Sequence, residues 1–281
     1  MPGRSSGPRP RLKSYLDHLY HTYDLSYLPT SALKFPRRYR QSEDIEVVAF
    51  IASCFAYGRV QGFTPPIDAL LQVLGPQPSQ FLLHFNPHRD GDRLQGFLYR
   101  FNTARDAICL LWLLRQVLER YGSLHALMLS GYSDRQEDTR AALATLIDHL
   151  LALDPRPVYP KGQLSNGMRY LLPNPRLGGA CKRLHLFLRW MVRRDHIDFG
   201  LWPELEPAKL IIPLDTHVAQ VSQRLGLTRL KSPGLGMALD ITRNLRRFDA
   251  ADPVKYDFAL CRLGMLRSRS QFTVDGSPSR Q

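Results

Sequence analysis

Lys182 is the residue whose type and position most clearly suggest covalent chemistry. It follows Gly178-Gly179-Ala180-Cys181 and precedes a stretch of helical periodicity, so we expect it in the first turn of a helix. The positive end of the helix dipole and the charge of Arg183 both lower the pKa of an amine at this place, and a partly neutral amine is a nucleophile. The pattern therefore predicts a reactive lysine. The alternative is that Lys182, Arg189 and Arg193 form one solvated basic face, opposite the apolar face of the helix.

Asp215, 33 positions after Lys182, is the second candidate. It lies between an apolar segment, Ile211–Leu214, and a helical pattern that ends at Gly226, which is the place of an N-cap. Backbone N–H groups orient a capping carboxylate and keep it ionised, so it is also able to stabilise a cation that develops beside it. His217, in the first turn of this helix, is a candidate base or ligand, with a packed or solvated side chain as the alternative.

The composition restricts the partners and the class of protein. The chain has 281 residues, with 38 Lys and Arg against 25 Asp and Glu, a net charge of +13, which favours a polyanionic partner such as nucleic acid. With 44% apolar and 22% charged residues, it is outside the compositions typical of disorder. The longest apolar stretch, Val47–Tyr57, is too short for a membrane span, and the N-terminus has no apolar segment of a secretory signal.

The four cysteines lie far apart in the sequence, so neither a disulfide framework nor a metal knuckle is expected. They are Cys54, Cys109, Cys181 and Cys261. This usage fits a reducing cytoplasm. His18 and His21, with Asp17, lie one helical turn apart, but three such residues without a further ligand nearby do not favour a zinc site.

Hydrophobic periodicity predicts an all-α protein of about ten short helices. The segment Ala107–Tyr121 is typical, with apolar residues at steps of three and four. The other expected helices are Leu12–Tyr23, Ile45–Tyr57, Pro66–Leu74, Pro78–Phe85, Arg93–Phe101, Ser123–Leu129, Glu137–Leu153, Cys181–Arg194, Thr216–Leu225, Pro233–Phe248 and Pro253–Leu266.

Breaks in this periodicity predict the domain organisation. Proline and glycine interrupt residues 154–179, which we expect to form a long ordered loop or a junction between two lobes. Residues 1–13 are expected to be a basic disordered arm and residues 267–281 a disordered tail. A single two-lobed helical domain is therefore predicted over residues 14–266.

Three segments between Gly178 and Gly264 resemble the helix-hairpin-helix superfamily of DNA glycosylases. They are GGACKRLHLFLRWMVRRD, KLIIPLDTHVAQVSQRLGL and DPVKYDFALCRLG, and a weaker similarity covers KFPRRYRQSEDIEVVAFIASCFAYGRV. The sequence is similar to an uncharacterised bacterial branch of conserved hypothetical proteins and, beyond it, to the archaeal 8-oxoguanine DNA glycosylases. The stretch Gly178–Gly264 and the segment Lys34–Val60 together cover about two fifths of the chain.

The resemblance implies a two-lobed glycosylase fold in which Lys182 and Asp215 are the catalytic pair. It implies that RRDHIDFGLWPELEPAKL, which lies between them, is an insertion of this branch. In relatives, the backbone of a Leu-Pro-Gly-Val-Gly hairpin clamps a DNA phosphate; here Leu177-Gly178-Gly179-Ala180 is less regular. The residues expected to contact DNA are Gly178, Gly179, Arg183, Arg189, Arg37 and Arg38. The run Lys34–Arg40 combines cationic with aromatic residues, as surfaces that bind nucleic acid do, and a solvated loop is the alternative.

The resemblance also implies a pocket for the damaged base. In relatives specific for 8-oxoguanine, a polar residue reads the base edge and an aromatic residue four positions later stacks on the base. Asp257 matches the polar position, whereas Cys261 replaces the ring, and a thiol stacks less well. Leu186 is the third residue expected in this pocket. Taken alone, Asp257 is an ordinary acid in the first turn of a helix.

These observations lead to one functional prediction and two alternatives. We expect a base-excision repair glycosylase with AP lyase activity, a monomer that acts on an oxidised purine, foremost 8-oxoguanine, in double-stranded DNA. The resemblance implies a cytoplasmic, nucleoid-associated enzyme that needs no metal, iron–sulfur cluster or other cofactor. The first alternative is a DNA-binding protein of the same fold without catalysis. The second is an RNA-binding or RNA-processing protein.

Overall fold

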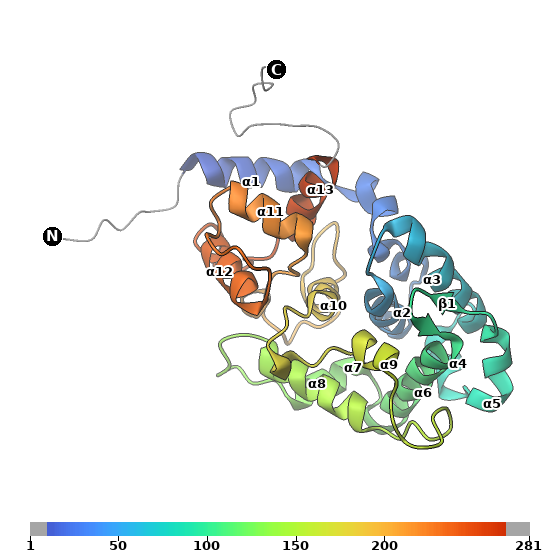
Figure 1. The fold of residues 1–281 in the computed structure, drawn as a ribbon. Helices are drawn as coiled ribbons and strands as arrows, with labels where there is room; N and C mark the ends of the chain where they lie inside the picture. The colour runs from blue at the N-terminus through green and yellow to red at the C-terminus, as the bar shows by residue number, and fades with distance from the viewer. Residues whose placement is uncertain (1–9, 268–281) are drawn as a thin grey trace. The chain divides into compact units, whose positions relative to one another are not determined.

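Apolar residues at helical spacing form helices along most of residues 10–267, the part of the chain that the computed structural model describes (Figure 1). The α-helices are α1 (Pro10–Thr22), α2 (Ser42–Phe55), α3 (Val60–Leu74), α4 (Pro78–Leu83), α5 (Pro87–Asp90), α6 (Ala104–Tyr121), α7 (Leu124–Ser130), α8 (Arg140–Ala152), α9 (Asn166–Leu171), α10 (Lys182–Val192), α11 (Thr216–Arg224), α12 (Leu235–Arg246) and α13 (Asp257–Arg267). Short 3₁₀ helices are η1 (Leu25–Thr30), η2 (Ala32–Lys34), η3 (Pro36–Arg38), η4 (Gly91–Leu94), η5 (Pro175–Leu177) and η6 (Pro207–Lys209). The predicted all-α class is confirmed for these residues. None of the helices within residues 10–267 is long and apolar enough to cross a lipid bilayer.

One predicted helix is absent from the structure, and two short helices were not predicted. The helix predicted over Arg93–Phe101 is wrong: this segment contains the end of η4 and the first strand of a two-stranded antiparallel hairpin, β1 (Leu98–Tyr99) and β2 (Asn102–Thr103). Gly96 and Arg100 have positive φ angles there, of 83° and 54°, which a right-handed helix does not allow. The other eleven predicted segments each contain an α-helix, and α5 and α9, which are only one or two turns long, bring the α-helices of the described residues to thirteen.

The chain divides into two compact units. One consists of the N-terminal segment through Tyr27 together with the chain from Ala180 onward, and the other is Leu28–Gly179. The second division therefore falls at the end of the proline- and glycine-rich segment. Helix α1 begins at Pro10, so residues 10–13, predicted as part of the basic arm, are helical; the rest of the arm lies outside the described residues. The predicted tail lies outside them too, apart from Arg267, the last residue of α13.

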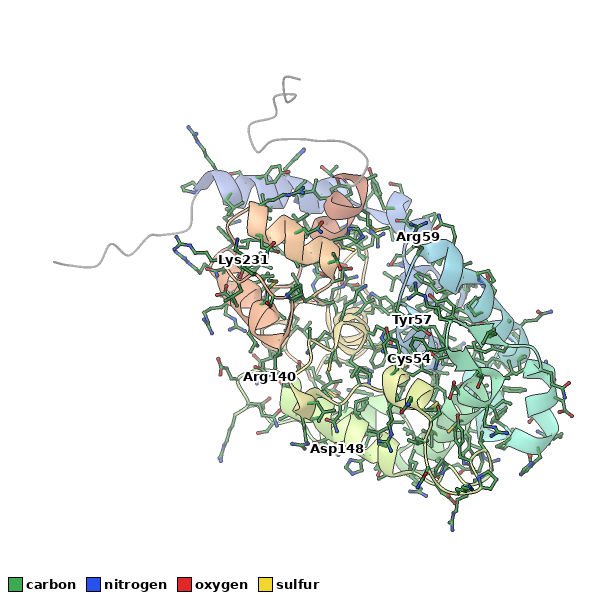
Figure 2. The ribbon with its side chains drawn as sticks, viewed as in Figure 1. Cys54, Tyr57, Arg59, Arg140, Asp148 and Lys231 are labelled. Atoms are coloured by element: carbon green, nitrogen blue, oxygen red, sulfur yellow. The ribbon has the colours of Figure 1, made fainter. Side chains whose placement is uncertain are left out.

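In the unit Leu28–Gly179, buried acidic side chains cap neighbouring helices. Asp44, on the almost fully buried α2, accepts hydrogen bonds at 2.8 Å from the backbone and hydroxyl of Ser79 in the first turn of α4. Glu46 accepts them from backbone N–H groups at the start of α7, at 2.8 and 3.1 Å. These bonds satisfy N–H groups that a helix end leaves unpaired. The partly exposed Asp148 of α8, labelled in Figure 2, does not cap a helix and instead binds the guanidinium group of Arg176 at 2.7 Å.

Asp106 orders the proline- and glycine-rich segment of the same unit. Its carboxylate completes a capping box with Thr103 at the start of α6. It also accepts hydrogen bonds from the hydroxyl of Tyr159, at 2.6 Å, and from that of Ser165, the N-cap of α9. A Cβ atom at Gly167 would lie 2.5 Å from this carboxylate, so only glycine fits there. The segment is an ordered loop, as predicted, with one short helix that the sequence pattern did not indicate.

In the other unit, α11 and α13 pack closely, and α1 packs on α13. All of α10 from Arg183 onward is buried except the half-buried Leu186. Gly264 is the point of closest approach of α13 to α11, because a Cβ atom there would lie 2.7 Å from the Cβ of His217 and 3.1 Å from its backbone. The absence of a side chain at Gly264 thus brings the N-terminal turn of α11 against α13.

We expect Gly264→Ala to lower the free energy of unfolding by about 1–3 kcal/mol, because the new methyl group must displace backbone as well as side chain. The control is Gly236→Ala in α12, where no atom lies within 4 Å of the added Cβ; it should be neutral or stabilising by up to about 1 kcal/mol. Urea unfolding of both variants measures the difference. Equal stabilities would show that α11 and α13 do not need this close approach.

Candidate active site

The backbone before α10 takes an unusual path that sets the position of Lys182. Gly178 has a φ of 75°, and Cys181, the N-cap residue, has a φ of 42°, both in the left-handed region. That region costs a non-glycine residue about 1 kcal/mol or more. Helix α10 begins directly after this turn, so Lys182 is in its first turn as predicted.

Asp215 caps α11, also as predicted, and its two carboxylate oxygens have different partners. Oδ1 accepts a hydrogen bond of 2.8 Å from the backbone N–H of Val218. Oδ2 lies 3.2 Å from Nζ of Lys182 and accepts a hydrogen bond of 3.7 Å from the thiol of Cys261. The cap fixes the carboxylate, and the second oxygen remains available to the site.

Lys182 and Asp215 therefore meet although they are distant in sequence, and both remain accessible to solvent. The side chain of Lys182 is 32% exposed and that of Asp215 17%. Cys261, on α13, is half-buried beside them. The three residues come from the starts of α10 and α11 and from the middle of α13. The carboxylate of Asp215 thus contacts both an amine and a thiol at an accessible place.

The pKa of Lys182 is shifted in the direction opposite to the one expected. Burial lowers it, but the negative charge and hydrogen bond of Asp215, helped by the charge of Asp257, outweigh burial and raise it. The sequence argument counted only the helix dipole and Arg183, because it did not place these acidic groups. Burial raises the pKa of Asp215, but the charge of Lys182 and the hydrogen bond from the backbone N–H of Val218 lower it more, so the pKa is below its ordinary value. The resting pair is therefore an ammonium and a carboxylate.

Asp257 lies behind this pair, deeper in the unit. Its side chain is 3% exposed, and Oδ2 is 2.5 Å from the guanidinium of Arg189. Oδ1 is buried and has no hydrogen-bond partner within residues 10–267. Burial raises the pKa of Asp257 to about 6, and the charge of Arg189 only partly opposes this, because Arg189 is shared with a second carboxylate. Burial likewise raises the pKa of the Cys261 thiol to about 12, so it is neutral at physiological pH.

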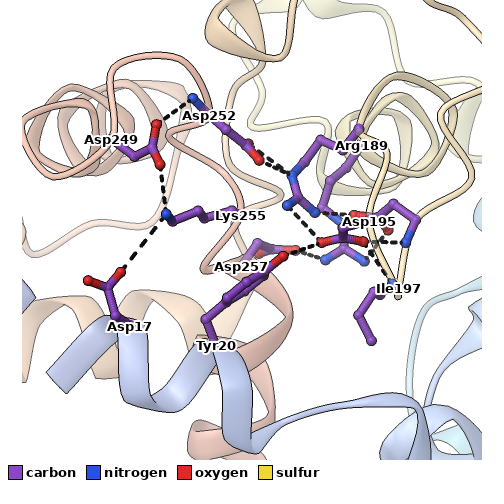
Figure 3. A network of polar contacts seen from close by, with 11 residues as sticks. Asp17, Tyr20, Arg189, Asp195, Ile197, Asp249, Asp252, Lys255 and Asp257 are labelled. Carbon is purple, nitrogen blue, oxygen red and sulfur yellow. Dashed lines mark hydrogen bonds and ion pairs between the residues drawn. The ribbon is translucent and has the colours of Figure 1, made fainter. Parts of the chain in front are cut away.

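The alternative interpretation of α10, a solvated basic face, is wrong for Arg189 and Arg193. Arg189 and Arg193 are 2% and 3% exposed and belong to a buried ionic network (Figure 3). Asp198 bridges them, at 3.1 Å from Arg189 and in contact with Arg193. Arg193 also binds Asp252 and Asp195, each at 2.9 Å. The prediction that Arg189 contacts DNA is inconsistent with this network, because Asp198 and Asp257 already neutralise its charge. The helix wheel alone did not place these carboxylates over the polar face.

Three acids of this network, Asp195, Asp198 and Asp252, were missed by the sequence analysis. Asp195 and Asp198 lie in the predicted insertion, and Asp195 also accepts a hydrogen bond of 2.9 Å from Tyr20 of α1. Their signal was the sequence RRDHID, in which two arginines precede two acids. The ion pairs themselves were not evident from the sequence, because Asp252 and Asp257, the other acids of the network, follow more than fifty residues later.

The other predicted site residues are spread between the two units. Arg183 is buried, and Leu186 is half-buried on α10. Gly178, Gly179, Arg37 and Arg38 belong to the unit Leu28–Gly179. Arg38 is exposed, pairs with Asp68 at 2.7 Å, and lies over the ring of Phe35. Within residues 10–267, no three His, Cys, Asp or Glu side chains are grouped so that they could hold a metal ion.

Comparison with known proteins places the chain in a family. The model of one family, DUF2400, matches residues 32–266, most of the chain. The chain belongs to the DUF2400 family. The family is described as a protein of unknown function, so membership in it does not assign an activity to this chain. No curated protein and no solved structure matches it significantly. The region that matches the family model includes Lys182, Asp215, Asp257 and Cys261.

Proposed function

We propose that this DUF2400 protein is a DNA N-glycosylase with AP lyase activity, which removes an oxidised purine, foremost 8-oxoguanine, from double-stranded DNA. The observation that carries the proposal is the 3.2 Å contact between Nζ of Lys182 and Oδ2 of Asp215 at an accessible place. Cleavage of a glycosidic bond with lyase activity needs both an amine that forms a bond to C1′ and an anion that stabilises the cationic sugar.

The charge state of the pair favours one order of steps. Because the resting Lys182 is protonated, the glycosidic bond breaks first, and the base departs with the bonding electrons and accepts the proton from Lys182. The carboxylate of Asp215 stabilises the positive charge on the sugar meanwhile. The amine, now neutral, adds to C1′. The nitrogen then carries two protons and a positive charge. Transfer of one of these protons to O4′ of the sugar breaks the C1′–O4′ bond and leaves a protonated Schiff base, from which β-elimination of the 3′-phosphate cleaves the strand.

Asp257 is proposed to read the edge of the extruded base. Its Oδ1 is a buried acceptor without a partner within residues 10–267, and such an atom costs free energy until a donor reaches it. A purine N–H group is a donor of that kind. Cys261 and Leu186 supply apolar contact at most, since neither provides a ring on which the base stacks. Extrusion itself costs a few kcal/mol, which contacts with the DNA backbone must offset.

Trapping with borohydride tests the proposal. The full chain is incubated with duplexes that carry 8-oxoguanine, uracil, an alkylated purine or thymine glycol, and borohydride reduces any Schiff base to a stable adduct. We expect an adduct with the 8-oxoguanine duplex that Lys182→Gln abolishes. The matched control is Lys255→Gln, which removes another lysine held by a carboxylate, Asp249 at 2.6 Å, and should trap like the wild type.

Two outcomes would overturn the proposal. If Lys182→Gln forms as much adduct as the wild type, Lys182 is not the nucleophile. If no lesion is excised or trapped but the duplex binds with a steep salt dependence, the protein is a DNA-binding protein. Stronger competition by structured RNA than by duplex DNA would favour the RNA alternative.

A further inference from the structure

A second concavity lies in the same unit as Lys182 but is lined by other residues. It is a hollow of about 580 Å³ between α1, the segment that follows α11, and α12. None of the residues of the candidate active site lines it. The lining residues are Leu12, Gly226, Leu227, Thr228, Arg229, Leu230, Gly236, Leu239, Asp240, Arg243, Asn244, Arg247 and Phe248.

The hollow is strongly cationic. Three arginines line it, Arg229, Arg243 and Arg247, all of them exposed. Arg243 and Arg247 are one helical turn apart, a spacing at which like charges repel. Neither Arg229 nor Arg243 has an ion-pair partner within residues 10–267. Lys231, labelled in Figure 2, adds a further exposed cation next in sequence to this lining. Within the described residues, Arg229 and Arg243 thus differ from Arg189 and Arg193, whose charges buried carboxylates neutralise.

The single acid of the lining, Asp240, is already engaged. It accepts a hydrogen bond of 2.6 Å from the hydroxyl of Thr228, and Asn244 donates to its backbone carbonyl at 3.0 Å. The hydroxyl of Thr228 in turn accepts from the backbone of Leu230 at 3.2 Å. These bonds hold the loop that carries Arg229 against α12, so the hollow has a fixed wall.

The remaining lining is apolar or lacks a side chain. Leu12, Leu239 and Phe248 contribute apolar surface from α1, α12 and the residues after α12. Gly226 ends α11 with a φ of 67°, in the left-handed region, and a Cβ atom at Gly236 would meet nothing within 4 Å. The hollow therefore combines guanidinium groups with apolar side chains, and at Gly226 and Gly236 its lining is bare backbone.

We infer that this hollow binds a nucleotide, with its phosphate groups on the arginines and its base on the apolar wall. Guanidinium groups match phosphate oxygens in geometry and charge, and the volume is in the range of small-molecule sites. A free nucleoside triphosphate and the 5′-phosphorylated end of a nucleic-acid strand share this chemistry. The inference does not depend on the proposed function, because no residue of the Lys182 site takes part.

Calorimetric titration of the full chain tests the inference, with adenosine triphosphate, tripolyphosphate and adenosine as probes. We expect saturable binding of adenosine triphosphate that Arg243→Glu weakens about tenfold or more, because a charged hydrogen bond is replaced by repulsion. Phe248→Ala should weaken adenosine triphosphate but not tripolyphosphate. A 5′-phosphorylated and a 5′-hydroxyl oligonucleotide distinguish the two sources: a preference for the phosphorylated strand assigns the site to strand ends.

Controls separate this site from general attraction of anions to a basic protein. Arg135→Glu changes the charge equally at an exposed position of the other unit and should leave the affinity unchanged, as should Lys182→Gln. Circular dichroism checks that Arg243→Glu folds, which its exposure favours. The inference is overturned if adenosine triphosphate does not saturate the wild type, or if Arg135→Glu weakens binding as much as Arg243→Glu.

Discussion

Asp215→Asn is expected to lower the rate of base excision about a hundredfold or more while leaving the fold almost as stable as in the wild type. Removing one group that stabilises transition-state charge costs enzymes factors of this size. Asparagine keeps an oxygen for the N–H of Val218, which Oδ1 of Asp215 now accepts at 2.8 Å, and Asn caps helices as well as Asp. Single-turnover excision and thermal unfolding measure the two effects separately.

Asp215→Ala is the matched comparison. It removes the cap as well as the charge, so it should lose activity to a similar extent and in addition lower the stability by about 1 kcal/mol. If asparagine and alanine destabilise equally, the cap does not contribute. If Asp215→Asn retains activity within a few-fold of the wild type, the carboxylate does not stabilise the sugar cation, and the assignment of Asp215 is wrong.

The same variant has a signature that does not require a substrate. Asp215 is the first of the groups that raise the pKa of Lys182 against the lowering effect of burial. Neutralising it leaves burial less opposed, so the pKa of Lys182 should fall and more of the amine should be neutral at a given pH. An amine reagent followed by mass spectrometry should then modify Lys182 faster in Asp215→Asn. Unchanged or slower modification would contradict the electrostatic coupling of the pair.

The sequence predicted those parts of the site that depend on local patterns. Asp215 as an N-cap and Lys182 in a first turn both follow from residues next to them in the chain, and both are confirmed. The resemblance to glycosylases gave the reason to pair them. The direction of the pKa shift of Lys182 was wrong because it depends on charges of α11 and α13, which no local pattern places.

The faces of α10 show a second limit of local patterns. A helix wheel assigns charged residues to solvent, and this would place Arg189 and Arg193 outside. The structure instead covers that side with Asp198 of the insertion and Asp257 of α13. A partner segment can bury a polar face when it brings the opposite charges, and the helix sequence itself does not contain this information.

The hairpin β1–β2 shows that weak propensities yield to packing. The pattern of Arg93–Phe101 fitted a helix, yet the buried rings of Phe97 and Tyr99 both pack on Phe55 of α2. Gly96 supplies the left-handed turn between η4 and the hairpin. A short segment of this kind takes its conformation from the surface on which it lies.

Replacing Arg189 by leucine is expected to lower the free energy of unfolding by about 3–5 kcal/mol at neutral pH, the largest effect on stability that we predict. The substitution leaves Asp257 buried without a counterion and leaves Asp198 with Arg193 alone. Removal of one partner from a buried ion pair costs this much because the other charge stays desolvated. Since domains are stable by about 5–15 kcal/mol, the loss is large, and chemical unfolding measures it.

The loss should depend on pH, because Asp257 titrates near the physiological range. Its pKa in the folded protein is about 6, above the ordinary carboxyl value, so the folded state binds this proton more tightly than the unfolded chain. Its contribution to stability is therefore fully present below the ordinary carboxyl pKa and is lost as the pH rises through about 6. Without Arg189 the pKa rises further. The deficit of Arg189→Leu should thus be smaller at pH of about 5 than at about 8.

A double variant decides whether Asp257 is the cause. Arg189→Leu combined with Asp257→Asn has one buried charge fewer than Arg189→Leu alone, so it should regain part of the lost stability at neutral pH and lose most of the pH dependence. It also provides a folded reference if Arg189→Leu alone does not fold. Asp257→Asn by itself leaves Arg189 paired with Asp198 and should cost less than Arg189→Leu. If the double variant is no more stable than Arg189→Leu at neutral pH, the unpaired carboxylate of Asp257 is not what the arginine compensates.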